Sequence, residues 1–468
     1  MCTEGDITAG AEAPNRVSGQ APQAKYRDVF AVPEFRALWG AQLVSVIGDQ
    51  LARVALTVLV YKQTSSALLA AVTFMLSVVP VFVGGVTLAW LADRFPRRRV
   101  MIACDVFRCL LVAVMALPRM PLALLVALLA IVTLVGAPFT AARASIYPDV
   151  LAGDRYVAGT AITLTTNQFA QVIGFALSGA AVALLGTRTS LVIDAATFAL
   201  SGVIVACWVR ARPAPAPRRA RPAAATDVGS GAAPAGGSGA AADAGSGAAA
   251  DAGSGAAPDG AEGDGPDADG RLAGAVRAVF GTPVLLLPML FGWLAAFYNS
   301  PEGVAAPLAR SLGGGAAAVG AILAAQALGE TAGMLLYGRL MRPQTRLRLM
   351  GPLAIATCGV LTLFFARPGF AATLIILVAS GAFGAYQIAA NAAFVRAVPA
   401  HWRARAFGLA QGGMSLGQGT VLVLAGAAAQ RFAPATVIAV AGAVGTVCAA
   451  GVAAGWLRAR KQDEPEGL

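Results

Sequence analysis

The sequence is poor in charged residues and nearly lacks histidine and lysine. Charged residues make up 13% of its 468 residues, whereas a soluble chain of this length carries about 25%. It has one histidine, His401, and its lysines are Lys25, Lys62 and Lys461. This shortage of charge argues against a soluble enzyme built around one large core.

Several functional motifs are also missing. No GxxxxGK[ST] loop is present, so the chain has no P-loop for ATP. The six cysteines form no CxxC pair, so neither a disulfide framework nor a zinc site is expected. We expect no cofactor and no metal. The first 30 residues contain no apolar core of a signal peptide, so none is expected to be cleaved.

Long apolar runs dominate what is present. Hydrophobic residues make up 57% of the chain, and runs of 18 or more apolar residues are typical of bilayer-spanning helices. The runs predict an all-α membrane protein with twelve transmembrane helices in two sets of six. The first set is predicted at 37–61, 67–91, 100–117, 121–142, 158–185 and 189–209. The second is predicted at 284–308, 316–338, 348–366, 370–395, 406–429 and 434–456.

The positive charges predict the orientation of these helices. With the N-terminus inside the cell, twenty-seven of the 35 lysines and arginines fall in inside segments and six in outside connections. This bias agrees with the positive-inside rule and predicts cytoplasmic N- and C-termini. The net charge of +11 therefore indicates membrane topology, with the lipid bilayer and not nucleic acid as the partner.

A low-complexity segment separates the two sets of helices. Residues 229–260 are four octads that begin GSGAA, a composition that predicts a flexible linker without a core. The predicted organisation is a cytoplasmic tail (1–34), a six-helix bundle (35–209), a disordered linker (210–270), a second six-helix bundle (271–457) and a cytoplasmic tail (458–468).

The two halves resemble each other, which predicts pseudo-symmetry. AARASIYPDVLAGDRYVAG follows the fourth predicted helix and AAFVRAVPAHWRARAFG follows the tenth. Both pass through arginine, proline, arginine and glycine into the next helix. Duplication of this kind is typical of transporters whose binding site lies between two halves.

A short basic motif lies between the second and third predicted helices. It reads LAWLADRFPRRRVMI and resembles the signature loop of the major facilitator superfamily, G-x-L-A-D-R-x-G-R-R, with Ala89 and Pro96 in place of the glycines. Further stretches, VIGDQ, DVFR, RASIYPDVLAGDR, IDAATFALS, NSPEGVAAPLA and VPAHWRARAFG, strengthen the resemblance. Together they look like the twelve-span drug:proton antiporters of the macrolide-efflux and enterobactin-exporter group, over roughly residues 29–457 apart from the linker.

This resemblance implies a secondary transporter. We expect proton-coupled efflux of amphipathic drug-like small molecules by alternating access, and thus a contribution to multidrug resistance. The expected protein is a monomer, multi-pass in the inner (plasma) membrane. The alternative is a dedicated exporter of a siderophore or another secreted metabolite. A membrane-embedded enzyme is a remote alternative, because the outside loops are short and His401 stands alone, and no catalytic residues are assigned.

The motif loop and its neighbours are candidate gating residues. Asp93 is an anion at a helix end beside arginines, where it can latch the cytoplasmic side. The alternative is that the loop only sets the membrane topology through its positive charges. Asp105 and Arg108, one turn apart, are expected to join an inner charge cluster that acts as a gate more than as a proton site. The gating loop and cluster comprise Asp93, Arg94, Arg97, Arg98, Asp105, Arg108 and Arg143.

Charges inside helices are costly in lipid and often functional. Asp49 and Arg53 are spaced i,i+4, so they are either a static pair or a pair that breaks when the carboxylate binds a proton. Glu302, beside Pro301, lies either at a helix break facing a cavity or at the outer water interface. Glu330 lies either in the cavity or between helices. The coupling candidates are Asp49, Arg53, Glu302 and Glu330.

Uncharged polar residues also fall inside predicted helices. They are able to hydrogen-bond a substrate or to join helices, and both roles stay open. The substrate-cavity candidates are Asn167, Gln171, Gln326, Gln387 and Asn391. Asp194, near the outer end of the sixth helix, is expected to be a structural hydrogen-bonding group.

Overall fold

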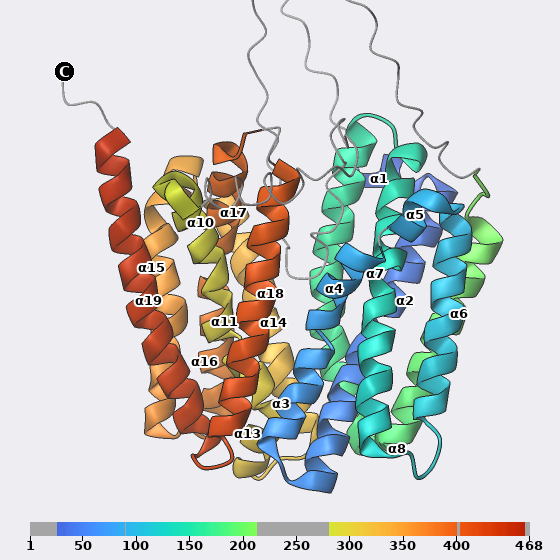
Figure 1. Ribbon diagram of the computed structural model, residues 1–468, viewed down its shortest axis with the longest axis horizontal. Helices are drawn as coiled ribbons and strands as arrows, with labels where there is room; N and C mark the ends of the chain where they lie inside the picture. Colours follow the sequence, from blue (N-terminus) through green and yellow to red (C-terminus); the bar gives the residue numbers. More distant parts are fainter. Residues whose placement is uncertain (1–25, 89, 213–279, 400–402, 464–468) are drawn as a thin grey trace, which may run out of the picture.

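The computed structural model describes residues 26–88, 90–212, 280–399 and 403–463. Every regular element within these ranges is a helix, which confirms the all-helical fold. The predicted linker octads at 229–260 and His401 lie outside the described residues. The helices run in two groups that stand side by side, coloured blue to green and yellow to red in Figure 1.

The first bundle contains the elements before residue 213. In chain order these are α1 (Tyr26–Phe30), α2 (Pro33–Thr64), α3 (Ala67–Leu76), α4 (Val79–Thr87), α5 (Trp90–Arg94), α6 (Arg97–Met115), α7 (Leu122–Val150) and α8 (Asp154–Trp208).

The second bundle contains the elements from residue 280 onward. They are α10 (Pro283–Trp293), α11 (Ala295–Tyr298), α12 (Ser300–Gly303), α13 (Ala305–Ser311), α14 (Ala316–Leu340), α15 (Pro343–Leu361), η1 (Thr362–Ala366), α16 (Phe370–Phe383), α17 (Tyr386–Ala397), α18 (Arg403–Ala428) and α19 (Pro434–Asp463).

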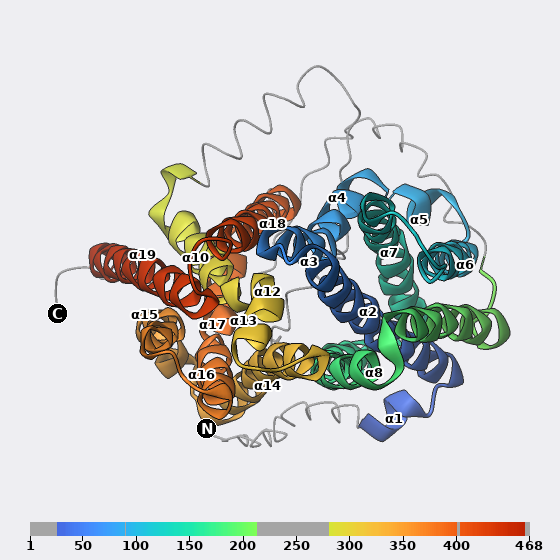
Figure 2. The same cartoon turned by 90° about the horizontal axis from the view of Figure 1, so that it is seen from below.

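Within the described ranges, nine helices are long and apolar enough to cross a membrane. One of them, α8, has 55 residues, and at about 1.5 Å per residue a straight helix would measure roughly 80 Å, far more than about 30 Å of hydrocarbon. The chain instead turns at Gly186, where φ is 83° and ψ is 167°. Glycine adopts this backbone conformation readily. Helix α8 is therefore two arms, as Figure 2 shows.

Two further predicted spans are broken by proline. Helices α3 and α4 are separated at Ser77 and Val78, just before Pro80. The span that begins at Pro283 is divided into α10, α11, α12 and α13, with Pro301 inside α12. Proline removes a backbone donor and clashes with the preceding turn. Such breaks are tolerated at membrane depth where protein or a cavity surrounds them.

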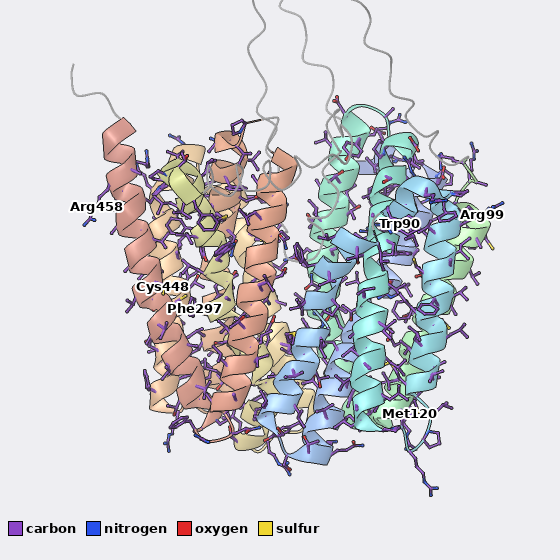
Figure 3. All side chains as sticks on the ribbon, in the orientation of Figure 1. Trp90, Arg99, Met120, Phe297, Cys448 and Arg458 are labelled. Carbon is purple, nitrogen blue, oxygen red and sulfur yellow. The ribbon has the colours of Figure 1, made fainter. Side chains whose placement is uncertain are left out.

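The two ends of the molecule differ. Arg99 and Arg458 lie at the upper end in Figure 3, here called the arginine-rich end, and Met120 lies at the opposite end. The bundles are joined near the opposite end. The Gln430 amide donates a hydrogen bond to Ser66 Oγ across 2.9 Å, and the Arg310 guanidinium lies 5.8 Å from the Tyr61 ring centroid.

The bundles also meet through glycine. Gly179 on α8 and Gly320 on α14 lie backbone to backbone, and an added Cβ on Gly320 would be 2.6 Å from the Gly179 Cα atom. Figure 2 shows α8 beside α14 and α3 beside α18. Small residues allow this close approach of helices in membranes.

Large apolar side chains cover the outside of both bundles. Leu184 is 83% exposed, Leu340 75%, and Val447 74%. A soluble monomer seldom exposes such residues in quantity. Together with the nine apolar helices, this surface makes the chain a multi-pass membrane protein.

Candidate functional site

The first bundle contains a buried ion pair that joins α2 to α6. Arg108 donates to the Asp49 carboxylate. The Arg108 side chain is 5% exposed and that of Asp49 is 34% exposed, so the acid is the accessible partner. The direct ion-pair partner of Asp49 is therefore a guanidinium from another helix, whereas the sequence predicted Arg53 of the same helix.

Arg53 turns away from Asp49 toward the break between α3 and α4. Its guanidinium donates to the Ser77 carbonyl across 3.2 Å and lies 5.6 Å from the Phe74 ring centroid and 5.9 Å from that of Phe175. Arg53 also interacts electrostatically with Glu302 of the second bundle and with Asp49. It is thus a half-buried cation that interacts with one acid from each bundle.

Two more aspartates lie beside the Asp49–Arg108 pair. Asp105 on α6 is fully buried and accepts a 2.7 Å hydrogen bond from Ser201. Asp194 on α8 is also fully buried, and its carboxylate accepts a 3.4 Å hydrogen bond from Thr197. The sequence predicted a structural role for Asp194 but gave no sign that it lies next to Asp49.

A glycine on α2 brings Asp194 to this position. An added Cβ on Gly48 would meet the Thr197 hydroxyl and would lie 2.5 Å from Asp194 Oδ1. The second arm of α8 therefore packs on α2 at the residue just before Asp49. The motif VIGDQ contains both the glycine and the acid, and it was the sequence signal that could have located this contact.

Of the predicted gating residues, Asp105 and Arg108 lie beside Asp49. The loop arginines, next to Arg99, form a separate group at the arginine-rich end. Arg97 donates to Asp149 across 2.7 Å and to the Ser145 carbonyl across 2.6 Å, both on α7. Arg98 donates to the Ala206 carbonyl of α8. Arg94 is exposed and Arg143 is buried on α7. The Asp93 side chain lies outside the described part, so the latch remains a prediction.

A further contact at this end was not predicted. Arg212, just past α8, donates to both carboxylate oxygens of Glu34 at 2.5 and 3.0 Å. Because its protonated form donates to Glu34, the pKa of the Arg212 guanidinium is raised above its ordinary value. Bidentate pairs of this kind are geometrically specific. The contact fastens the end of α8 to the first turn of α2.

In the second bundle, Glu302 lies in the broken span. Its neighbours Ser300, Pro301 and Gly303 are buried, and Gln418 on α18 donates to its carboxylate across 3.4 Å. An added Cβ on Gly303 would be 2.9 Å from Leu422, so α12 packs closely on α18. Of the two alternatives for Glu302, this packing favours a position inside the helix break.

A polar network surrounds Tyr298 in the same bundle. The Gln326 amide donates to the Tyr298 carbonyl across 3.1 Å and to Asn299 across 2.7 Å. The Gln387 amide donates to the Tyr298 hydroxyl across 3.2 Å. Glu330 is within hydrogen-bond reach of Gln326 and interacts electrostatically with Glu302. Tyr298 was not among the predicted site residues, yet it connects two of them.

The remaining predicted cavity residues have mixed surroundings. Asn167 accepts a 2.9 Å hydrogen bond from Gln42 of α2, so it joins two helices. The Gln171 amide donates to Gln168 of the same helix across 3.2 Å. Asn391 is half-buried, one turn beyond Gln387 on α17.

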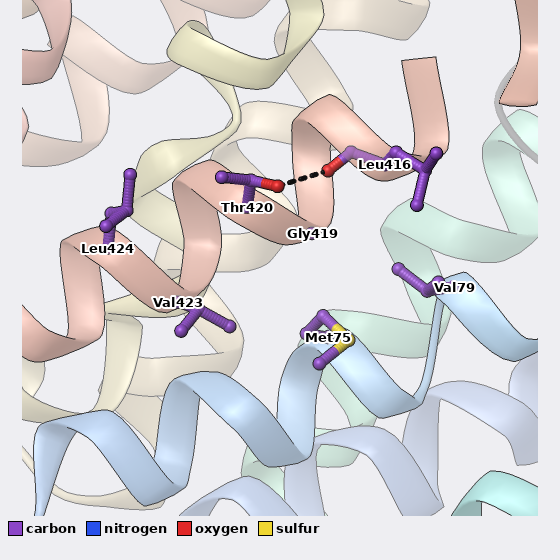
Figure 4. Close-up of a pocket in the computed structure, with 7 residues that line it drawn as sticks. All are labelled: Met75, Val79, Leu416, Gly419, Thr420, Val423 and Leu424. Atoms are coloured by element: carbon purple, nitrogen blue, oxygen red, sulfur yellow. Dashed lines mark hydrogen bonds between the residues drawn. The ribbon is translucent and has the colours of Figure 1, made fainter. Parts of the chain in front are cut away.

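Two apolar clefts lie away from these residues. One, of about 350 Å³, is lined by side chains of α3, α4 and α18 (Figure 4). Its one hydroxyl group, on Thr420, donates to the Leu416 carbonyl of its own helix. The other, of about 420 Å³, lies between α10, α11 and α19. Neither contains a predicted site residue.

The fold and the buried charges define a class of protein: an all-helical, multi-pass membrane transporter with two bundles. The chain belongs to the Major Facilitator Superfamily, whose family model matches residues 38–302 and 300–467. The described helices and this family assignment together support transport as the activity.

Solved structures share this fold at low sequence identity. A bacterial homologue of the human lysosomal transporter Spinster, inward-facing and occupied, is 16% identical, with 95% of this chain and 98% of that chain covered and a TM-score of 0.58. A POT family transporter in complex with 5-aminolevulinic acid is 12% identical, with 92% and 99% covered and a TM-score of 0.63.

A bacterial homologue of the human drug peptide transporters is also 12% identical, with 92% and 99% covered and a TM-score of 0.58. A comparison with curated proteins finds no match. The structural likeness therefore defines the fold.

Proposed function

We propose that the chain is a proton-coupled exporter of amphipathic, cationic organic compounds that works by alternating access. The observation that carries this proposal is Arg53, which interacts electrostatically with Asp49 of the first bundle and Glu302 of the second. Protonation of either acid removes one attraction at the junction between the bundles. Proton binding would then change how firmly the bundles hold together.

The proposed topology has twelve spans with both termini in the cytoplasm. Counting the two arms of α8 separately, and adding α6 and α18, brings the nine candidate helices to twelve. Helix α6 is less apolar than these nine because it carries Asp105 and Arg108 besides its N-terminal arginines. Helix α18 is less apolar because it contains glutamine and several glycines. The arginine-rich end would face the cytoplasm of a cell with this protein in its inner membrane.

The proposal includes the predicted domain boundaries. These are bundles at 35–209 and 271–457, a linker at 210–270, and tails at 1–34 and 458–468. We further propose that the protein functions as a monomer and that Asp93, with Arg97 and Arg98, forms the cytoplasmic latch. Because the contacts of Ser66, Tyr61 and Gly179 join the bundles near the opposite end, the described state would be open to the cytoplasm.

The substrate class follows from the charges around the junction. Glu302 and Glu330 lie close enough to repel each other, while Arg108 is already engaged by Asp49. The junction therefore favours an added positive charge. A cationic amphipathic compound fits these surroundings, and drug:proton antiport of this kind would contribute to multidrug resistance.

The test is substrate flux into and out of proteoliposomes. A thermal-shift screen on purified protein would first identify binding compounds, with siderophores and other metabolites included beside cationic drugs. We expect an imposed pH gradient to drive accumulation of the best cationic hit. A response to sodium or to membrane potential alone would contradict proton antiport, and tighter binding of an anionic metabolite would favour the dedicated exporter.

A further inference from the structure

Three aspartates share one arginine inside the first bundle. Arg108 pairs with Asp49 and interacts electrostatically with Asp105 and Asp194. The aromatic ring of Phe198 lies 4.0 Å from its guanidinium, and α7 presents Gly136 on another side. Were all four groups ionised, the cluster would carry two uncompensated negative charges.

Two of these acids are too deeply buried for their ionised forms to be stable. Asp105 and Asp194 are both 0% exposed. Asp105 Oδ1 and Asp194 Oδ2 are buried and have no hydrogen-bond partner among the residues that the structure describes. An ionised carboxylate in such surroundings costs so much free energy that the group is neutralised instead. Neutralisation requires a cation at each acid.

A proton fits this requirement better than a metal ion. Among the residues that the structure describes, no group of three histidine, cysteine, aspartate or glutamate side chains is close enough to hold a metal ion. The ionisable groups that interact with Asp194 are Asp49 on α2 and Arg108 and Cys109 on α6. Of these, Arg108 supplies positive charge, and it is paired with Asp49.

We propose that Asp105 and Asp194 form a buried proton store that exchanges protons with Asp49 through Arg108. When Asp49 takes up a proton, its ion pair with Arg108 is lost and the guanidinium keeps its charge. Arg108 then turns to Asp105 or Asp194, which becomes the new counter-ion as its proton leaves to solvent on the exposed side of Asp49. One proton is bound and one is released. For its role in transport, this inference rests on the proton coupling proposed above.

The test is infrared difference spectroscopy of the full chain in lipid at neutral pH. The measured signal is the carbonyl stretch of protonated carboxyl groups, identified by its shift in D₂O. We expect Asp105→Asn and Asp194→Asn each to remove the signal of one group. Asp154→Asn, at an exposed acid in the first turn of α8, is the matched control and should remove none.

A third variant tests the exchange. Asp49→Asn imitates protonated Asp49, so Arg108 should recruit a store residue and the signal of one protonated carboxyl should disappear. Unchanged spectra in Asp105→Asn and Asp194→Asn would overturn the store, and so would loss of their signals when sodium replaces potassium. An unchanged spectrum in Asp49→Asn would overturn the exchange.

The result is separate from the proposed function. Signals present in a protein whose flux ignores a pH gradient would keep the store and reject proton-coupled export. If the signals are absent in a protein whose flux is driven by a pH gradient, the proton store is rejected and proton-coupled export is kept. Asparagine matches the size of neutral aspartic acid, and an unchanged thermal unfolding midpoint would show that each variant is folded.

Discussion

Arg53 and Arg108 are the cationic neighbours of two of the predicted coupling acids. Arg108 holds Asp49 within the first bundle, while Arg53 lies between Asp49 and Glu302 of the second. Asp49 is therefore the acid with two cationic neighbours and some exposure. In the proposed mechanism, transport would depend on which carboxylate gives up its partner when a proton or a cationic substrate arrives.

The first prediction concerns Asp49. Asp49→Asn should abolish accumulation of substrate driven by a pH gradient, because the amide cannot exchange a proton, while downhill exchange survives. For one-for-one exchange, a gradient of one pH unit is worth about 1.4 kcal/mol and sustains roughly tenfold accumulation. In a proteoliposome flux measurement, the variant should show no accumulation of substrate.

The controls for this experiment are wild type and Asp154→Asn, which lies in the exposed first turn of α8. Glu302→Gln and Glu330→Gln are measured in parallel, since they are the alternative coupling residues. If Asp49→Asn accumulates substrate as wild type does, Asp49 is not the coupling carboxylate.

At the scale of helices, glycines decide where the bundles touch. The backbone of α14 at Gly320 lies against that of α8 at Gly179, and neither has a flexible side chain that could yield. On the same helix, an added Cβ on Gly338 would meet nothing within 4 Å. One helix therefore offers both a test position and its control.

We predict that Gly320→Ala destabilises the described state, because the added methyl group forces α8 and α14 apart. Overpacking of this kind costs about 1–3 kcal/mol. Thermal unfolding midpoints in detergent should fall for Gly320→Ala and stay level or rise slightly for Gly338→Ala, since alanine favours the helix. Equal midpoints for both variants would show that the contact is not tight.

Helix α5 carries the third prediction. It is the short helix Trp90–Arg94 between α4 and α6 that contains Asp93. Asp93→Asn keeps the size of the side chain and removes its charge, so membrane insertion should be preserved while cycling slows. The measurement is labelling of single cysteines placed at the two ends of the molecule. Unchanged labelling together with full transport would remove Asp93 from the gate.

On the scale of the whole molecule, alternating access requires the contacts near the opposite end to separate. Ser66 follows α2 and Gln430 follows α18, so their hydrogen bond bridges the bundles directly. If the described state is open to the cytoplasm, holding this contact closed should stop the cycle.

The fourth prediction is a reversible lock at this contact. In a background with Cys2, Cys104, Cys109, Cys207, Cys358 and Cys448 replaced, Ser66→Cys with Gln430→Cys should cross-link under oxidation. Transport should stop and should return on reduction, whereas each single variant should be unaffected by oxidant. Full transport by the cross-linked protein would contradict movement at this end.

The sequence by itself determined the helical membrane fold, because long apolar runs in lipid must satisfy their own backbone hydrogen bonds. The signature loop also indicated the family that the family match confirmed. The sequence did not determine which charged side chains contact each other. Asp49 and Arg53 share a helix face, yet Asp49 pairs with Arg108, and Asp194 reaches the same cluster from 145 residues further along the chain. These contacts depend on helix packing at Gly48 and on the turn at Gly186, and such side-to-side packing is decided in three dimensions by shape and burial, not by spacing along one helix.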